Sequence, residues 1–449
     1  MVDCIVVGAG LAGLATASEL VRKGRDVVVL EARSRVGGRV ENVRLPDGHI
    51  LEMGGQWLGP GHDAMYELVS RFGLTLLEPS EGDLAIRIGG RVRHVPTKEE
   101  VEHSLTPFEI SDLGQGLLRL RRLAERVRSD AAWAGSNATW LDQGLLRWVS
   151  TNVRTPGGQE YFTRIFEGAM RVSIGDMTLG EALRRVNDGV DLESLVAING
   201  GLKQERVAGG IAQVADLLAA ELGDRLRLGT PVSSIRQDAD QIVVTTRDGE
   251  EFTARSVVVT LPPRLAAALE YSPPLPESRQ EVTDRVPVGN VIKAALVYPT
   301  PWWKSEGFSG QMGSDEGPIR VIFDNSVRGY PRGVLMGFFE GVEASGMSKR
   351  SASLRERAFV EAVVRVFGEA GRKPIEYLDR DWLAEEFTGG CHGAHFAPGI
   401  WTASGPALAE PVGRIHFAGA EYASRFNGYM EGAVRSGTDV AGKVNRLLG

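Results

Sequence analysis

The chain has 449 residues and a formal net charge of −7 at pH 7, with 43% hydrophobic and 24% charged residues. This is the composition of a globular protein of two or three domains, and the acidic balance argues against a nucleic-acid or anionic-membrane partner. The sequence contains no run of about 18 apolar residues, so it predicts no transmembrane helix. Cys4 and Cys391 are the only cysteines, too few for a disulfide framework, so we expect a cytoplasmic protein.

The first forty residues predict a strand–helix–strand unit. Two apolar runs, residues 4–7 and 27–30, flank a glycine-rich turn and a helix expected over residues 14–23. The turn reads G-x-G-x-x-G, in which the first glycine makes the tight turn, the second admits a pyrophosphate and the third lets helix and strand pack closely. These glycines are Gly8, Gly10 and Gly13, and Glu31 ends the second strand, where its carboxylate can accept ribose hydroxyls. The unit therefore predicts a dinucleotide site at a helix N-terminus.

Two further segments near the N-terminus are rich in glycine. The first directly follows Glu31 and adds three arginines, whose planar guanidinium groups suit phosphates. The second follows a short strand expected to start at Ile50, and its glycines let the backbone approach a ligand. The positions singled out in these segments are Ala32, Arg33, Gly38, Arg39, Gly54, Gly55, Gln56 and Trp57.

The remaining pattern alternates helices and strands, as hydrophobic periodicity and turn residues indicate. We expect helices over residues 63–72, 106–128, 211–221, 351–367 and 428–447, and a hairpin over 82–95. We expect strands over residues 226–228, 232–237, 241–246, 251–254, 256–261, 291–297, 319–323, 334–339 and 414–421. Lys293 lies within one of these apolar strands, and burial of an ammonium group without a partner is costly. It is either a functional cation or a strand-end lysine that reaches solvent.

Taken together, these motifs resemble those of the flavin amine oxidases, in particular soluble bacterial monoamine oxidases. The resemblance covers nearly the whole chain and implies an α/β fold with a glutathione-reductase-like FAD-binding domain of the Rossmann type, into which a mixed α+β substrate domain is inserted. The implied FAD-binding domain comprises residues 1–80, 197–288 and 382–449. The implied substrate-binding domain comprises residues 81–196 and 289–381.

The implied reaction is the oxidative deamination of an amine. The amine passes a hydride equivalent to the flavin, the imine hydrolyses, and dioxygen is reduced to hydrogen peroxide. Alternatives are an L-amino-acid oxidase, for which Arg320 is the candidate clamp for the substrate carboxylate, a flavin desaturase, and a non-catalytic FAD-binding protein. The implied partners are a small amine and dioxygen, with no nucleic acid, membrane or metal. The oligomeric state stays open, a homodimer being one option.

The resemblance also implies roles for single residues. The implied catalytic residues are Lys293, Trp382, Tyr429 and His392, and Gln204 joins Tyr429 and His392 in contacting the substrate. His392 stands where the family has a second tyrosine, which puts the usual arylalkylamine preference in doubt. Cys391 matches the cysteine that monoamine oxidases link to the flavin, although some relatives lack this bond. The other implied cofactor contacts are the glycine-rich segments above with Glu31, Val232, Gly419, Ala420, Glu421 and Met430.

Overall fold

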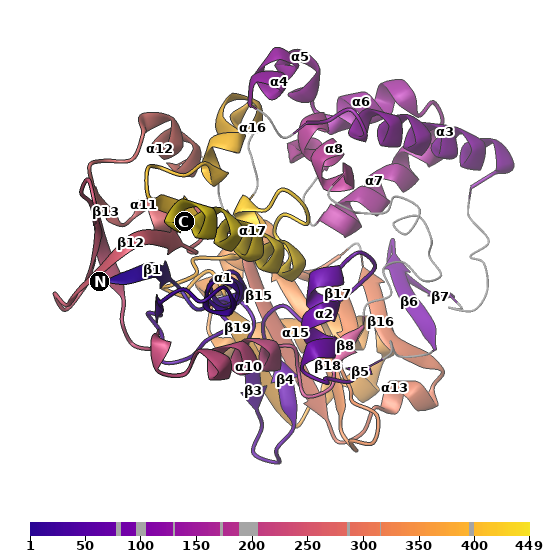
Figure 1. Cartoon of the computed structure of the whole chain (residues 1–449). Coiled ribbons are helices and arrows are strands. Elements are labelled where there is room, and N and C mark those ends of the chain that lie inside the picture. The colour runs from indigo at the N-terminus through magenta and orange to yellow at the C-terminus, as the bar shows by residue number, and fades with distance from the viewer. Residues whose placement is uncertain are drawn as a thin grey trace.

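The computed structural model describes residues 1–77, 82–95, 105–128, 131–170, 174–187, 205–284, 288–314, 316–394 and 399–449. Two large β-sheets organise this part of the chain, and a group of helices lies to one side of them (Figure 1). The helical group consists of α3 (Pro107–Ala124), α4 (Ala131–Ser136), α5 (Ala138–Leu141), α6 (Leu145–Asn152), α7 (Pro156–Met170) and α8 (Leu179–Asn187).

The first sheet has eight strands and contains the predicted N-terminal unit. In it, β1 (Val2–Val7) pairs in parallel with β2 (Val27–Leu30) on one side and with β12 (Glu251–Val259) on the other. The remaining strands are β9 (Leu226–Arg227), β10 (Val232–Gln237), β11 (Ile242–Thr246), β13 (Glu270–Ser272) and β21 (Ile415–Phe417).

Both faces of this sheet are covered, because successive residues of β1 point to opposite sides. Cys4 and Val6 belong to a core cluster with the helices α1 (Leu11–Arg22), α10 (Ala212–Leu222) and α17 (Met430–Leu448). Ile5 and Val7 belong to a second cluster that continues into the helical group and takes in α11 (Pro263–Ala267) and α12 (Glu277–Asp284). The sheet is therefore a buried layer between helices, as expected for parallel strands.

The second sheet has seven strands in the order β19-β15-β18-β17-β16-β6-β7. The second strand in this order, β15 (Val291–Tyr298), is buried along its whole length. The others are β6 (Asp83–Ile88), β7 (Arg91–Val95), β16 (Phe308–Ser314), β17 (Ile319–Asp324), β18 (Gly333–Glu340) and β19 (Glu376–Asp381).

The two faces of β15 have different neighbours. Ile292, Ala294 and Leu296 pack in a cluster with α15 (Ala352–Phe367). Ala295 and Val297 pack against the hairpin of β3 (Asn42–Arg44) and β4 (Ile50–Glu52), through a cluster that includes Leu51 and Met53. Lys293 shares the alternation of Ala295, so its side chain is directed toward the N-terminal segment.

Shorter elements complete the fold. Two-stranded ladders join β5 (Leu76–Leu77) to β8 (Arg206–Val207) and β14 (Val288–Gly289) to β20 (Cys391–Ala394). The remaining helices are α2 (Asp63–Arg71), α13 (Trp302–Ser305), α14 (Gly341–Ser348) and α16 (Ile400–Ser404). Within the described ranges, no helix has the length and apolarity needed to cross a bilayer.

Most predicted elements are confirmed within a few residues, including the hairpin, which turns at Gly89 and Gly90, both with positive φ. Three predicted strands have the wrong bounds. The separate strands predicted over 251–254 and 256–261 form the single strand β12, whose first half pairs with β11 and whose second half pairs with β21. The strand predicted over 414–421 ends at Phe417, because Gly419 takes a φ of 154° and a 3₁₀ turn follows.

The strands of the eight-stranded sheet come from the three ranges predicted for the FAD-binding domain, and those of the seven-stranded sheet from the two ranges predicted for the substrate domain. The division of the chain at those boundaries stays a prediction.

Candidate active site

The glycine-rich turn after β1 has the geometry that its spacing predicts. Gly8 has a φ of 102°, which favours glycine. A Cβ atom on Gly13 would lie 1.9 Å from the Gly8 carbonyl oxygen, so only glycine allows α1 to pack this closely. Gly10 precedes the first residue of α1 and lies opposite Gly37 in a parallel bridge. The free backbone N–H groups at the start of α1 therefore lie beside Gly10 and Gly37, which have no side chains.

Glu31 holds this turn against the second strand. Its carboxylate accepts hydrogen bonds from the backbone N–H groups of Ala9, at 2.6 Å, and Arg33, at 2.9 Å. The side chain is buried. Both oxygens have lone pairs beyond these bonds, so Glu31 can still accept from a hydroxyl group of a ligand.

A continuous cavity of about 640 Å³ opens beside this turn. This is within the range typical of small-molecule and cofactor sites, roughly 300–1,000 Å³. Its lining comes from both sheets: it includes Gly8 and Glu31 at the first sheet and Lys293 and Phe338 on β15 and β18 of the second. The cavity therefore connects the predicted dinucleotide site with the predicted reactive lysine.

Most predicted site residues line this cavity. They are Gly8, Gly10, Glu31, Ala32, Arg33, Gly38, Arg39, Gly54, Gly55, Gln56, Trp57, Val232, Lys293, Trp382, Cys391, Gly419, Ala420, Tyr429 and Met430. Gly13 lies beneath the turn, and Glu421 lies behind Arg39. Gln204 is outside the described residues, and of His392 the structure describes only the backbone, in β20.

Lys293 is 2% exposed and donates two hydrogen bonds. Its Nζ donates to the Gly54 carbonyl oxygen at 2.7 Å and to the side-chain oxygen of Gln56. The rings of Trp57 and Phe338 lie 5.4 and 5.8 Å from Nζ, within reach of a cation–π interaction. Burial lowers the pKa of Lys293 to about 7, although the carboxylate of Glu52 opposes this shift. The amine can therefore exist in both protonation states near neutral pH.

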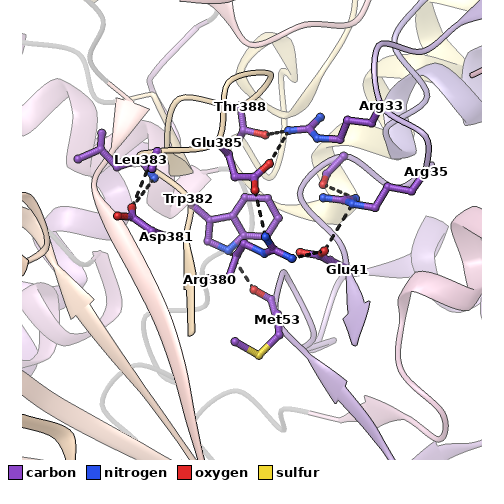
Figure 2. Close-up of polar contacts among 12 residues, drawn as sticks. Arg33, Arg35, Glu41, Met53, Arg380, Asp381, Trp382, Leu383, Glu385 and Thr388 are labelled. Carbon is purple, nitrogen blue, oxygen red and sulfur yellow. Dashed lines mark hydrogen bonds and ion pairs between the residues drawn. The ribbon is translucent and has the colours of Figure 1, made fainter. Parts of the chain in front are cut away.

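Trp382 is fixed by its indole N–H, which donates to the Met53 carbonyl oxygen at 3.0 Å (Figure 2). Its backbone N–H donates to the Val291 carbonyl oxygen, which attaches it to the strand of Lys293. The side chain is 1% exposed and its ring borders the cavity. Trp382 thus joins the hairpin of β3 and β4 to the second sheet.

A chain of ion pairs lies beside Trp382 in Figure 2 and links the arginine-rich segment to the segment before Cys391. Arg33 donates to Thr388 at 2.6 Å and pairs with Glu385 at 3.4 Å. Arg380 bridges Glu385, at 3.1 Å, and Glu41. These contacts position Cys391 at the cavity wall, after Gly389 and Gly390, which both have positive φ.

The start of α17 also borders the cavity. Tyr429 is the residue before its first turn, and Met430 begins the helix. The first amides of a helix lack intrahelical acceptors and form the positive end of its dipole. Glu431, 0% exposed, turns away and accepts from Ala64 N at 3.1 Å and Met65 N at 2.9 Å, at the start of α2.

Several lining residues were not predicted from the sequence. His62 faces the ring of Tyr429 edge-on at 5.8 Å, and burial lowers its pKa, which favours the neutral imidazole. Phe338 is the cross-strand partner of Lys293. Phe426 has a φ of 53°, and its ring packs edge-on against those of both His62 and Tyr429. The Gly-Pro-Gly run before His62 was the available signal for that residue, whereas Phe338 had none, because cross-strand pairing is invisible in one sequence.

Arg320, the candidate clamp for a substrate carboxylate, is exposed and is not among the described residues that line the cavity. The observation that motivated an amino-acid oxidase therefore has no support in the described structure.

The cavity suits FAD on structural grounds. Backbone atoms of the glycine-rich segments form its wall at the dinucleotide end, and a Cβ atom on Gly54 would lie 2.2 Å from the Arg39 carbonyl oxygen, so this wall depends on glycine. Arg33, Arg39 and the start of α1 offer positive charge for phosphates, and Glu31 offers acceptors for ribose. Aromatic side chains and Lys293 line the other end, where a flavin ring would lie.

Comparisons with known proteins agree with this geometry. Residues 11–445 match the family of flavin containing amine oxidoreductases. The chain is 32% identical over 453 residues to a Dictyostelium discoideum protein called a "probable flavin-containing monoamine oxidase A", with 99% of this chain and 98% of the relative covered.

Two solved structures are also similar. A putrescine oxidase bound to putrescine matches with a TM-score of 0.90 and 27% identity over 99% of both chains. A cyclohexylamine oxidase from Brevibacterium oxydans matches with a TM-score of 0.88 and 29% identity, over 100% of this chain and 99% of the other. The predicted fold class and the FAD cofactor are confirmed by these matches. The chain is a member of the flavin-containing amine oxidoreductase family, whose members oxidise amines with a bound flavin.

Proposed function

We propose that this enzyme oxidises a small primary amine with a hydrocarbon substituent and passes the electrons to dioxygen, which forms hydrogen peroxide. The observation that carries the proposal is the continuous cavity that adjoins both the glycine-rich turn at Gly8 and the buried amine of Lys293. A cofactor held by the glycine-rich turn would extend along this cavity toward Lys293. We further propose a cytoplasmic location, because the chain has only two cysteines.

The aromatic surroundings of Lys293 support a hydrocarbon substituent. The ring of Trp57 lies 4.8 Å from that of Phe323 and 5.8 Å from that of Phe338. Tyr429 borders the same cavity with His62 and Phe426. Such rings bury apolar surface favourably and exclude water, which strengthens electrostatic interactions in the site.

Bound FAD supplies the two-electron acceptor for the α-carbon of the amine. The side chains of the protein bind the amine, orient it and exclude water. Lys293 holds a proton at Nζ or releases it, because its pKa is lowered to about 7. The positive end of α17, at Met430, stabilises negative charge that develops beside it.

Cys391 is the proposed point of covalent attachment of the flavin. It lines the cavity, and its segment is held by Arg33 through Thr388. One variant of the putrescine oxidase with a similar structure carries a cysteine in place of an alanine as part of a redesign of cofactor binding.

A panel of primary amines tests the activity, with hydrogen peroxide and bleaching of the flavin absorbance as the two readouts. The panel contains benzylamine, cyclohexylamine, putrescine and two compounds whose α-carbon carries both a carboxylate and a hydrogen, phenylglycine and cyclohexylglycine. We expect the monoamines to reduce the flavin and the carboxylated compounds to fail. Turnover of the carboxylated compounds alone would make the enzyme an amino-acid oxidase.

The role of Lys293 is tested by Lys293→Met, with the exposed Lys349→Met as the matched control. We expect Lys293→Met to slow flavin reduction or reoxidation by about 10²–10³-fold, the usual loss when a preorganised group is removed from a reacting site. The flavin content should stay at the wild-type level. Unchanged rates in both half-reactions would remove Lys293 from the mechanism.

A further inference from the structure

A buried chain of two side-chain amides lies behind Lys293. The Gln56 oxygen accepts a hydrogen bond from Lys293, and the Gln56 Nε2 group donates to Asn325 Oδ1 at 2.7 Å. Gln56 is 1% exposed and Asn325 is 2% exposed. The motifs of the sequence did not single out Asn325, which directly follows β17 and is far from Gln56 in the chain.

The direction of these hydrogen bonds is set at the Lys293 end. Lys293 can donate but, when protonated, cannot accept, so the end of Gln56 that faces it must be the carbonyl oxygen. The amide nitrogen of Gln56 then faces Asn325, which must present its own oxygen. Rotation of the Gln56 amide by half a turn would place an N–H group against the ammonium and leave Asn325 without its donor. Asn325 therefore holds Gln56 in the orientation that accepts from Lys293.

Asn325 itself is held in a rigid corner. Its backbone N–H donates to Val334 O at 2.7 Å, and its carbonyl oxygen accepts from Arg206 at 3.2 Å. Arg206 also donates to the Ser326 carbonyl oxygen at 3.0 Å and lies 3.7 Å from Glu52. The anchor of the amide chain is thus the backbone of β17 and β18, the same sheet that carries Lys293.

Two acceptors occupy two of the three hydrogen positions of the Lys293 ammonium. These are the Gly54 carbonyl oxygen, at 2.7 Å, and the Gln56 oxygen. The remaining position carries the third N–H when the amine is charged and the lone pair when it is neutral. Because both acceptors are fixed, the third N–H bond or the lone pair of Nζ also has a fixed direction. Lys293 itself borders the cavity.

We propose that Asn325 and Gln56 are positioning residues for Lys293: Asn325 orients the Gln56 amide, and Gln56 sets the direction and the proton affinity of the Lys293 amine toward the flavin. The inference rests on the proposed function, because it matters for the reaction only if Lys293 does.

The charged groups around Lys293 set the background for its titration. Glu52 and Cys391 favour the charged amine and Arg206 opposes it. On the neighbouring strands, Phe338 and Arg380 are the cross-strand partners of Lys293, and Arg380 pairs with Glu41 and Glu385. None of these groups changes in the variants below, so a shift in the titration of Lys293 reports on the amide chain.

The experiment compares Asn325→Leu with Asn325→Asp in the FAD-loaded enzyme. Leucine removes the acceptor for Gln56 at similar volume, so we expect a lower pKa of Lys293, because the Gln56 oxygen no longer stabilises the charged amine. Aspartate keeps the acceptor and adds negative charge, so we expect a higher pKa. Lysine-selective ¹³Cε labelling and NMR measure this pKa independently of turnover, and Lys293→Met identifies the signal.

The second readout is the pH profile of flavin reduction and reoxidation. For Asn325→Leu we expect the inflection to move to lower pH by about one unit, and the maximal rate to fall about tenfold or more. The inflection for Asn325→Asp should move to higher pH. Asn290→Leu is the matched control, since it removes another amide contact, to Ser345 at 2.7 Å, beside the strand of Lys293.

Gln56→Met provides a second test in case Asn325→Leu fails to fold. It removes the acceptor directly and should shift the pKa of Lys293 in the same direction. The double variant Gln56→Met/Asn325→Leu should show the same pKa and the same rates as Gln56→Met alone. Unshifted titration and pH profiles in both single variants would overturn the inference. If Lys293→Met also leaves both half-reactions unchanged, the proposed role of Lys293 fails instead.

Discussion

Arg39 and Glu421 form a two-pronged ion pair across 382 positions of the sequence, with N–O distances of 2.5 and 2.8 Å. The pair joins the arginine-rich segment after β2 to the turn after β21, at the wall of the cavity. Although burial alone lowers the pKa of Arg39, the interaction with Glu421 raises it above the ordinary value for arginine. Arg39 therefore stays charged across the ordinary pH range.

The ion pair should respond unequally to the loss of each partner. Glu421 is 1% exposed and Arg39 is 23% exposed, so only the arginine can turn to solvent. We expect Arg39→Met to lower the free energy of unfolding by about 3–5 kcal/mol, the usual result when a buried charge loses its partner. Glu421→Gln should lower the free energy of unfolding by a clearly smaller amount. Urea denaturation measures both, and equal losses would show that Arg39 is held as rigidly as Glu421.

Removal of the Lys293 amine should change how stability depends on pH. The pKa of Lys293 is lowered from its ordinary value to about 7 in the folded state, so the unfolded chain binds an extra proton between about pH 7 and pH 10. This group therefore opposes folding most below pH 7, and its penalty disappears as the pH rises toward 10. We expect the stability of Lys293→Met relative to wild type to be highest below pH 7 and to decline with increasing pH.

The slope of that decline should approach about 1.4 kcal/mol per pH unit at most, the limit for one proton. Denaturant titrations at pH 6, 7.5 and 9 measure it, with Lys349→Met as the control that should show no such slope. A difference that grows with pH would contradict the lowered pKa.

Cys391→Ser tests covalent attachment of the flavin. We expect wild-type protein to retain FAD mass under denaturing mass spectrometry, because Cys391 borders the cavity. The serine variant should release its FAD in acid, yet remain folded, since the glycine-rich turn and the arginines are unchanged. An apoprotein mass for wild type would exclude the link and leave the family assignment intact.

Glu431 should stabilise the protein through the start of α2. It is 0% exposed and accepts from two backbone amides of that helix, Ala64 N and Met65 N. We expect Glu431→Ala to lower the free energy of unfolding by about 2 kcal/mol or more, because it removes a helix cap and leaves buried donors unpaired.

Asp63→Asn is the matched control for that variant. Asp63 lies at the same helix end and pairs with Arg435 at 3.2 Å, but its side chain is 81% exposed. Its replacement should therefore lower the stability much less than Glu431→Ala does. Thermal unfolding of both variants compares them. A loss for Asp63→Asn as large as that for Glu431→Ala would place the stabilisation in surface charge instead of the buried cap.

The sequence by itself determined the dinucleotide-binding unit and the chemical class of the site. Gly8 and Gly13 could be predicted because their requirements are local: Gly8 has a positive φ, and a Cβ atom on Gly13 would lie 1.9 Å from the Gly8 carbonyl oxygen. The alternation of buried residues likewise predicted most helices and strands. Through the family resemblance, it also singled out Lys293 as a buried cation before its surroundings were known.

Only the tertiary structure decided which distant residues meet. The contacts of Lys293 with Gln56, of Gln56 with Asn325 and of Arg39 with Glu421 each join segments that no local pattern connects. The same reason explains why the sequence predicts two strands where the structure has only β12. The polarity of the residues changes where β21 replaces β11 as the neighbouring strand, and a single sequence shows this change but not the neighbours. Hydrogen-bond direction and burial arise from such long-range contacts, and they set the proton affinity and orientation of Lys293.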